Sequence, residues 1–160
     1  ISALGSFECG FGRMETIDVS GKSIKVILVK NPAGLNQVIN FLLTETRDFQ
    51  LAFAINDNLA DGTDVSWLWD ADFEKLQQIQ KNAGNIYASG IRGEDLAVRL
   101  KYAGVSTEKI SIIKDYKILI ETGLDRTPPE CSFYVLPTYT AMLDMRKVLK
   151  KKFRLKEFWK

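Results

Sequence analysis

Short apolar runs alternate with segments of helical periodicity along most of this chain. Residues 14–19 and 23–29 favour strand and flank a Ser20-Gly21-Lys22 turn, so we expect a β-hairpin. Further strand-like runs occupy residues 51–55, 86–88, 110–113 and 131–136. The run at 24–29 is almost continuously apolar, which is typical of a strand buried on both faces of a parallel sheet.

Helical spacing of apolar residues fills the gaps between these strands. Leu35, Val38 and Ile39 recur at such spacing after Pro32, a residue that suits the first turn of a helix. We expect further helices at residues 73–80, 94–103, 116–122 and 138–150. Gly123 is expected to end the helix that begins at residue 116, and Tyr102 is expected among the residues that face the sheet.

This alternation predicts an α/β fold of Rossmann-like type, with a mostly parallel sheet, helices on both faces and the hairpin at its start. In such folds, ligands and partners contact the loops at the carboxyl ends of the strands. Four loops of this kind carry unusual residues, at 30–34, 56–72, 89–93 and 137–140. We therefore expect the functional residues to lie in these loops.

Histidine is absent from the 160 residues. A Ser-His-Asp triad or a Cys-His pair therefore cannot be completed within the chain, and Cys9 and Cys131 alone cannot build a zinc site of the usual kinds. No apolar run has the length of a membrane span, and no signal-peptide pattern occupies the N-terminus. Any role in nucleophilic catalysis thus needs a base from a partner.

The net charge of +2 conceals two oppositely charged segments. Residues 57–74, here called the acidic loop, hold six acids and no base, whereas residues 146–160 hold eight bases and one acid. The basic segment suits contact with nucleic acid or a membrane. The solvated face of a last helix explains it as well, and we favour this interpretation and expect no nucleic-acid partner.

Several sequence segments resemble a known family. The segment FGRMETIDVSGKSIKVILVKNPAG resembles the junction between the middle and C-terminal domains of the Mur ligase superfamily. The segments INDNLADGTDVSWLWDADFEKL, ASGIRGEDLAVRLKYAGV and VLPTYTAML, in this order, resemble the C-terminal domain of the MurT family over about residues 12–149. Residues 1–12 are then a linker or a remnant of a preceding middle domain. Residues 13–160 form a Mur-ligase-like C-terminal domain with a basic C-terminal helix or tail.

The resemblance implies an activity for a longer protein. MurT is the Mur-ligase-like subunit of lipid II isoglutaminyl synthase, which pairs with a glutamine amidotransferase, GatD. Together they amidate the D-glutamate α-carboxyl of lipid II to D-isoglutamine with ATP and glutamine, in the cytoplasm at the inner face of the membrane. ATP with Mg²⁺, and zinc, would bind to the missing middle domain, so we expect no cofactor here and little activity from this chain alone. A MurT aspartate is expected to complete the Cys-His pair of the GatD-like partner.

Six acids of the acidic loop compete for that role. They are Asp57, Asp61, Asp64, Asp70, Asp72 and Glu74. The first three lie around Gly62 and look like turn-forming residues, and the last two suit a helix N-terminus. Asp70 has no better structural role, so we predict it as the catalytic carboxylate, although a capping role stays open for it too. An aspartate beside a partner's imidazole fixes its tautomer and stabilises the imidazolium.

Trp67 and Trp69 immediately precede Asp70 within this otherwise acidic segment. Tryptophan is enriched among the residues that dominate binding energy at protein interfaces. We therefore predict that these two side chains bind the partner subunit, together with Asp64 and Asp72.

Lys30, Asn31 and Arg92 are the predicted substrate-binding residues. Lys30 and Asn31 follow a buried strand, and Arg92 lies in a Ser-Gly-Ile-Arg-Gly loop where it could contact a carboxylate or phosphate. A simple helix start explains Asn31 equally well. Arg99 is expected to face solvent or to pair with the acids at 94–95.

Two other functions stay open at this point. One is the C-terminal substrate domain of another Mur-type amide ligase, such as a folylpolyglutamate synthase, without an amidotransferase partner. The other is a non-catalytic α/β module that binds nucleic acid through its basic tail, which would leave the tryptophans unexplained.

Overall fold

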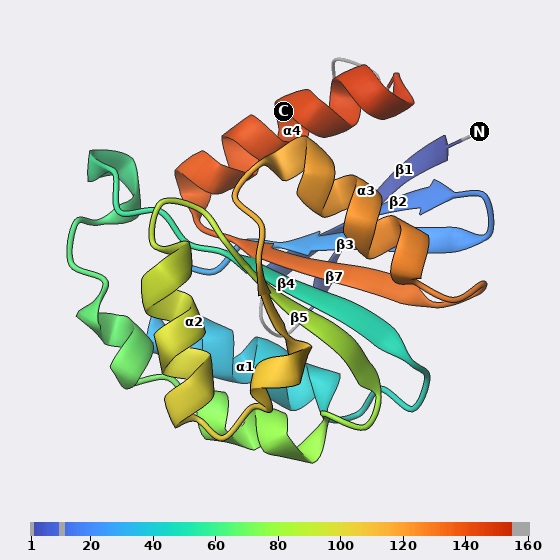
Figure 1. The fold of residues 1–160 in the computed structure, drawn as a ribbon. Helices are drawn as coiled ribbons and strands as arrows, with labels where there is room; N and C mark the ends of the chain where they lie inside the picture. Colours follow the sequence, from blue (N-terminus) through green and yellow to red (C-terminus); the bar gives the residue numbers. More distant parts are fainter. Residues whose placement is uncertain (1, 10–11, 155–160) are drawn as a thin grey trace.

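The computed structural model describes residues 2–9 and 12–154, which form one mixed sheet of seven strands between two layers of helices (Figure 1). The strand order is β1-β2-β3-β7-β4-β5-β6. The strands are β1 (Ser2–Cys9), β2 (Gly12–Val19), β3 (Lys22–Ile27), β4 (Phe49–Ala54), β5 (Ala83–Ser89), β6 (Ile110–Ile112) and β7 (Ser132–Pro137). The helices are α1 (Pro32–Leu42), α2 (Gly93–Tyr102), α3 (Tyr116–Arg126) and α4 (Tyr139–Phe153). Four short 3₁₀ turns complete the described elements: η1 (Leu59–Asp61), η2 (Ser66–Trp69), η3 (Phe73–Gln78) and η4 (Thr107–Lys109).

The predicted α/β architecture is confirmed. Strands β3, β7, β4, β5 and β6 pair in parallel, while β2 pairs antiparallel with β3 through the predicted hairpin. Its turn residues Ser20 and Gly21 both have positive φ, 49° and 82°, as a two-residue type I′ turn requires. The helix expected at 73–80 instead forms the 3₁₀ turn η3.

The N-terminal segment adds a strand that the sequence analysis did not predict. Residues Ser2–Cys9 form β1, which pairs with β2 from Ser2↔Val19 to Cys9↔Gly12. The sequence analysis placed no strand in residues 1–12, whereas most of this segment is in β1. Residues 1, 10 and 11 lie outside the described residues. The interpretation of the segment as a linker or as the remnant of a preceding domain stays a prediction.

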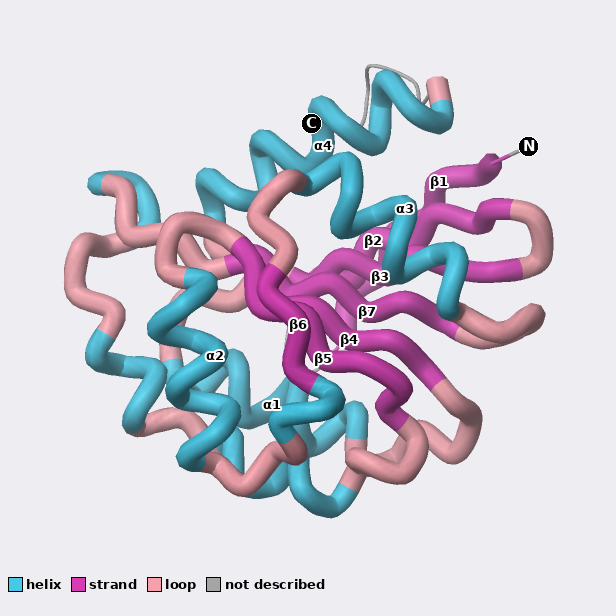
Figure 2. Tube along the Cα trace, in the orientation of Figure 1, coloured by secondary structure: helices cyan, strands magenta, loops and turns pink. Residues whose placement is uncertain are grey.

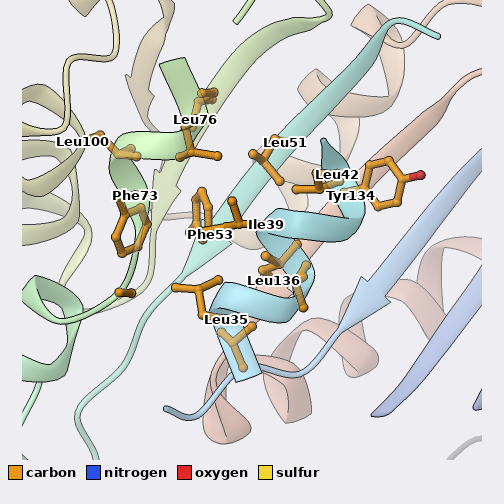
Figure 3. Packing of buried hydrophobic residues seen from close by; sticks show 14 of the residues in the cluster. Leu35, Ile39, Leu42, Leu51, Phe53, Phe73, Leu76, Leu100, Tyr134 and Leu136 are labelled. Carbon is orange, nitrogen blue, oxygen red and sulfur yellow. The ribbon is translucent and has the colours of Figure 1, made fainter. Parts of the chain in front are cut away.

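Strand β4 divides the core between the two faces of the sheet. Its alternate residues Leu51 and Phe53 pack with α1, α2 and η3, whereas Ala52 and Ala54 pack with α3 and α4. Figure 3 shows the first of these clusters, in which Leu35 and Ile39 of α1 lie near Phe53. Because every residue of β4 is buried, this strand is the centre of the fold.

Helix α3 continues past the glycine that was expected to end it. It runs from Tyr116 to Arg126, with Gly123 buried inside it. A β-carbon at Gly123 would overlap the ring of Phe133 on β7, so the glycine allows close approach of helix and sheet. The prediction of a helix end was wrong because glycine has two uses, chain termination and close packing, and the sequence does not distinguish them.

Candidate functional site

Asn56 joins three loops at the carboxyl edge of the sheet. It lies two residues after the end of β4 and is only 4% exposed. Its amide N–H donates to Thr138 Oγ1 at 2.9 Å, and its Nδ2 donates to Thr140 Oγ1 at 3.0 Å. Its Oδ1 accepts from the Ile91 N–H at 2.8 Å. The loops after β4, β5 and β7 are therefore tied together at this end of the molecule (Figure 2). The sequence analysis did not name Asn56 as a functional residue. Its one signal was a polar side chain directly after the apolar run at residues 51–55.

The start of the acidic loop is fixed to helix α4. The Asp61 carboxylate accepts from the Thr140 N–H at 2.7 Å and from Thr140 Oγ1 at 2.6 Å, and it also accepts from the Asn58 N–H at 3.1 Å. Asp57 lies 3.6 Å from Arg92 Nε. Both carboxylates are thus engaged by contacts within the chain.

Asp64 starts the turn that leads to the tryptophans. Its Oδ1 accepts from the Ser66 N–H at 2.9 Å, so Asp64 forms an Asx-type turn before η2. Hydrogen bonds from the Ser66 side chain and backbone hold the pKa of the Asp64 carboxyl below its ordinary value. The side chain of Asp64 remains exposed, so a contact with a partner stays a prediction.

Arg99 of α2 is buried beneath η2, with 2% of its surface exposed. Its Nε donates to the Leu68 carbonyl at 2.8 Å and its Nη2 donates to the Ala71 carbonyl at 2.9 Å. Nη1 and Nη2 bind the two Glu74 oxygens at 2.8 and 3.0 Å, and this bidentate contact lowers the pKa of Glu74. The expectation that Arg99 faces solvent or pairs with residues 94–95 is therefore wrong. Its partners come from a loop far away in sequence, which helical spacing cannot reveal.

Trp69 and Tyr102 form an exposed aromatic pair next to this arginine. Their ring centroids are 5.9 Å apart at 59°, and the two side chains are 55% and 73% exposed. Val98 lies one turn before Tyr102 on α2 and is also exposed. The expectation that Tyr102 faces the sheet is wrong. Trp69, Val98 and Tyr102 together are called the aromatic face below, and exposed apolar side chains gathered in this way often mark an interaction site.

Trp67 differs from Trp69 in its surroundings. It is half-buried and packs against the hydrophobic core that also contains Leu68. Part of its role is therefore to hold the acidic loop onto the fold. Its predicted contact with a partner depends on the exposed remainder of its ring.

Asp70 occupies the end of η2, between the exposed Trp69 and the buried Ala71. Its N–H donates to the Trp67 carbonyl at 3.0 Å, and its side chain is exposed. Within residues 2–9 and 12–154, the Asp70 carboxylate has no hydrogen bond or ion pair. It is therefore free to accept a hydrogen bond from outside the chain.

Asp72 is the nearest alternative to Asp70. It sits at the N-cap position of η3, but its side chain makes no capping hydrogen bond and instead lies 3.8 Å from Lys75 Nζ. Its N–H donates to Asn36 Oδ1 at 2.7 Å. The expected capping role of Asp72 is therefore wrong, and its carboxylate is only weakly occupied.

The predicted substrate residues do not gather at one point. Lys30 and Asn31 line a pocket of about 380 Å³ with Leu28, Ala60, Asp61, Gly62, Thr138 and Tyr139. Asn31 also caps α1, because its Oδ1 accepts from the Gly34 N–H at 2.8 Å. Arg92 is not among the residues that line this pocket, and its Nε lies 2.9 Å from an Asp95 oxygen. Lys30 is the exposed cation of the pocket, whereas Arg92 is held by acids of its own chain.

Metal-binding side chains do not cluster in the described part of the chain. No three His, Cys, Asp or Glu residues there come close enough together to hold an ion. The acids of the acidic loop are spread over separate hydrogen bonds with backbone and side-chain donors.

Comparison with known proteins identifies the family. A family model described as MurT ligase C-terminal matches residues 28–142. The MurT subunit of lipid II isoglutaminyl synthase (glutamine-hydrolyzing) from Streptococcus pneumoniae (strain ATCC BAA-255 / R6) is 37% identical over 140 residues, which is 87% of this chain and 30% of that protein. The subunit of the same name from Staphylococcus aureus (strain COL) is 36% identical over 143 residues, 89% of this chain and 31% of that protein. This chain therefore spans about a third of the length of these relatives.

Solved structures agree on the fold. The MurF ligase from Thermotoga maritima in complex with ADP superposes with a TM-score of 0.56 at 11% identity, over 95% of this chain and 33% of that one. A UDP-N-acetylmuramoyl-L-alanyl-D-glutamate–2,6-diaminopimelate ligase gives a TM-score of 0.54 at 13% identity, over 89% of this chain and 32% of that one. At such low identity these likenesses show the fold alone. The sequence comparisons distinguish among Mur-type ligases, and they do not support the alternative of a folylpolyglutamate synthase domain. The chain belongs to the MurT ligase C-terminal family.

Proposed function

We propose that this chain is the C-terminal domain of a ligase subunit that amidates the D-glutamate α-carboxyl of lipid II to D-isoglutamine, using ATP and glutamine. The family assignment supports this proposal, because both relatives named above are MurT subunits of a glutamine-hydrolyzing lipid II isoglutaminyl synthase. The partner in this proposal is a GatD-like glutamine amidotransferase that releases ammonia from glutamine. The domain described here docks that partner and completes its catalytic site.

The free carboxylate of Asp70 is the observation that carries the catalytic part. A thiol that attacks glutamine needs an imidazole, and this chain contains none. It can still contribute a carboxylate that accepts the Nδ1–H of the partner's histidine, which fixes the tautomer and stabilises the imidazolium. Asp61 and Glu74 are engaged by Thr140 and Arg99, whereas Asp70 is exposed and without a partner among the described residues.

The aromatic face is the proposed docking surface for the amidotransferase. A carboxylate that completes a partner's catalytic site must lie at the interface, and Trp69 of the aromatic face is the neighbour of Asp70. Exposed aromatic residues give large contact area at little cost in conformational entropy. Asp64 and Asp70 lie close to Trp69 in sequence, and Asp95 lies on α2, the helix that carries Val98 and Tyr102. The partner's surface is therefore expected to be apolar with a basic rim.

The pocket beside Lys30 is the proposed substrate side of the domain. The exposed ammonium of Lys30 could contact an anionic group of lipid II. Asn31 shapes the loop by capping α1. Arg92 would need to leave Asp95 to bind a carboxylate or phosphate of the substrate. A lipid-linked substrate implies work at the inner face of the membrane. None of the described helices has the length and apolarity to cross a bilayer.

ATP, Mg²⁺ and zinc belong to the same proposal as ligands of the longer protein. The sequence contains neither a Walker-type phosphate loop nor a four-cysteine zinc motif. Their binding residues would therefore come from a middle domain outside this chain. Mutations in that domain should abolish ATP-dependent amidation and leave glutamine hydrolysis intact. This result would support the proposed division of roles.

The catalytic proposal is tested by Asp70→Asn in the full ligase subunit bound to its glutamine amidotransferase. The substitution keeps the shape of the side chain but removes the charge that stabilises imidazolium. We expect complex formation to be unchanged and glutamine hydrolysis to fall by at least about 100-fold. Asp64→Asn and Asp72→Asn test the two competing acids, and Asp48→Asn, an exposed acid just before β4, is the matched control. Full hydrolysis by Asp70→Asn would refute the proposed role of this residue.

A further inference from the structure

Three lysines line a groove of about 410 Å³ where α3 and α4 lie side by side (Figure 1). Lys117 belongs to the first turn of α3, and Lys151 and Lys152 belong to the last turn of α4. The fourth described residue at this groove is the half-buried Val148. These four residues are called the basic groove below. The function proposed above uses none of them, so this concentration of positive charge is unexplained.

Two of the three ammonium groups have no counter-ion in the described part of the chain. Lys152 Nζ lies 3.0 Å from Glu121 Oε2. Neither Lys117 nor Lys151 forms a hydrogen bond or an ion pair with a described residue, and both side chains are exposed. The basic groove therefore presents uncompensated positive charge to its surroundings.

Helix stability does not account for this arrangement. Positive charge is favoured in the last turn of a helix but disfavoured in the first turn, where Lys117 lies. Lys147 and Lys151 are four residues apart on α4, a spacing at which like charges repel. Lys147 is itself 82% exposed, and its ion pair with Asp144 is long, at 3.9 Å. Like charges gathered at a cost to both helices indicate an anionic ligand from outside the chain.

The positive charge extends beyond the basic groove toward the C-terminus. Residues 146–160 hold eight bases and one acid, and large apolar residues lie among them. Phe153 is half-buried at the end of α4, whereas Leu155, Phe158 and Trp159 lie outside the described residues. Lysine and arginine interleaved with aromatic and aliphatic residues are typical of segments that bind the surface of an anionic membrane. A nucleic acid attracts the same charges, but the lipid-linked substrate of the proposed function favours a membrane.

The basic end of α4 lies away from the surfaces proposed for the amidotransferase and the substrate. Helix α4 begins at the acidic loop, where Thr140 contacts Asp61, and ends near the hairpin turn, because Lys152 lines a second pocket with Ser20 (Figure 1). Its 15 residues span about 22 Å. The aromatic face includes residues of α2, which covers the other face of the sheet. A membrane can therefore contact the end of α4 while the amidotransferase is docked and the pocket beside Lys30 is open.

We propose that the basic groove and the adjoining end of α4 form a binding surface for anionic phospholipid. Headgroup phosphates bind the ammonium groups of Lys117 and Lys151, and the neighbouring apolar side chains enter the interfacial layer. This contact holds the ligase subunit at the membrane that carries its substrate. The charge and the shape of the groove carry the inference, and only its purpose rests on the proposed function.

The test measures binding of the ligase subunit, in complex with its amidotransferase, to lipid vesicles by co-sedimentation. We expect binding to phosphatidylcholine vesicles that contain about one third phosphatidylglycerol, and little binding to pure phosphatidylcholine. Raising the NaCl concentration from about 0.1 M to about 1 M should release the complex, because the screening length falls from about 10 Å to about 3 Å. Equal binding to anionic and neutral vesicles would overturn the inference. So would binding to nucleic acid at the lower salt concentration without binding to anionic vesicles.

A pair of double variants locates the surface. Each lysine near an anionic membrane strengthens binding by roughly fivefold, so Lys117→Gln with Lys151→Gln should weaken vesicle binding by about 25-fold. Lys75→Gln with Lys81→Gln is the control, because it removes the same charge from η3 and the turn after it, on the other face of the sheet. Equal affinities of the two double variants would overturn the assignment to the basic groove. The lipid and salt comparisons use the wild-type complex, so they hold whatever the stability of the variants.

Amidation assays separate this inference from the proposed function. Lys117→Gln with Lys151→Gln should slow amidation of lipid II in anionic vesicles and should slow it much less when lipid II is dissolved in detergent micelles, where no membrane surface has to be bound. Equal slowing in vesicles and micelles would contradict the membrane contact. A complex that binds anionic vesicles but does not amidate lipid II in either form would overturn the proposed function and leave the binding surface in place.

Discussion

The Asp61 carboxylate binds both the backbone amide and the hydroxyl group of Thr140, at 2.7 and 2.6 Å, across 79 residues of sequence. This contact joins the acidic loop to the first turn of α4, where a negative charge is favoured by the helix dipole. The buried Asn56 shares the same Thr140 hydroxyl. The acidic loop is therefore anchored near its start by α4 at Asp61 and near its end by Arg99 of α2, which binds Leu68, Ala71 and Glu74.

Asp61→Asn should destabilise the domain. The substitution removes a charged acceptor from two short hydrogen bonds, and bonds to charged groups contribute about 1.5–3 kcal/mol each, so we expect a loss of about 1–3 kcal/mol in unfolding free energy. Chemical denaturation monitored by tryptophan fluorescence measures this loss. Asp48→Asn, at an exposed position, should change the unfolding free energy by less than about 0.5 kcal/mol. Equal stability of the two variants would show that the Thr140 contact contributes nothing.

Gly123→Ala should also destabilise the fold, although alanine normally favours helix. The new methyl group would overlap the Phe133 ring, which is fully buried against Tyr87 and cannot move aside without cost. Overpacking of this kind costs about 1–3 kcal/mol, more than the roughly 1 kcal/mol that helix propensity returns. Gly34→Ala in α1 is the control, since its β-carbon would meet only Asn31 Oδ1 at 3.4 Å. A higher melting temperature for Gly123→Ala would contradict this account of α3.

Trp69→Ala and Tyr102→Ala should each weaken the complex with the amidotransferase. A tryptophan at the centre of an interface commonly contributes 2 kcal/mol or more, so we expect Kd to rise by about 30-fold for Trp69→Ala. Titration calorimetry with the purified partner measures the change. Ile118→Ala is the control, because Ile118 is an equally exposed apolar residue on α3, which covers the opposite face of the sheet. Unchanged Kd values for both aromatic variants would place the docking surface elsewhere.

Acid should loosen the contact between Glu74 and Arg99. The hydrogen bonds from Arg99 lower the pKa of Glu74 in the folded protein, although burial opposes this shift. Ionised Glu74 therefore stabilises the fold above the unfolded-state pKa of about 4.3, and this contribution is lost as the pH falls through the lower folded value. Glu74 is 57% exposed, so we expect a difference below about 1 kcal/mol.

The comparison of wild type with Glu74→Gln isolates this contribution from those of other carboxylates. Unfolding free energies measured from about pH 6 down to about pH 3 should show the two proteins converge as Glu74 becomes protonated. A constant difference over this range would mean that the charge of Glu74 adds nothing to its contact with Arg99. The same series reports how firmly the turn beneath Asp70 is held in acid.

The residues proposed for docking and catalysis show how far sequence reasoning reached at the candidate site. The sequence analysis singled out Trp67 and Trp69 because large aromatic side chains stand out in an acidic segment, and Asp70 because the other acids had a structural role to fill. The same reasoning gave Asp72 a capping role that the structure does not contain. It placed Tyr102 toward the sheet and Arg99 toward solvent, and both orientations were reversed.

The sequence by itself determined the order along the chain of strands β2–β7 and helices α1–α4, the hairpin turn at Ser20-Gly21 and the buried face of α1. These features depend on neighbours a few residues apart, so periodicity and turn chemistry report them directly. Tertiary structure alone decided that Arg99 is buried beneath Trp69, that Asn56 joins three loops and that Gly123 packs against Phe133. Each of these contacts joins residues from different elements. Their energy comes from burial and hydrogen bonds that exist only once the sheet has brought those elements together.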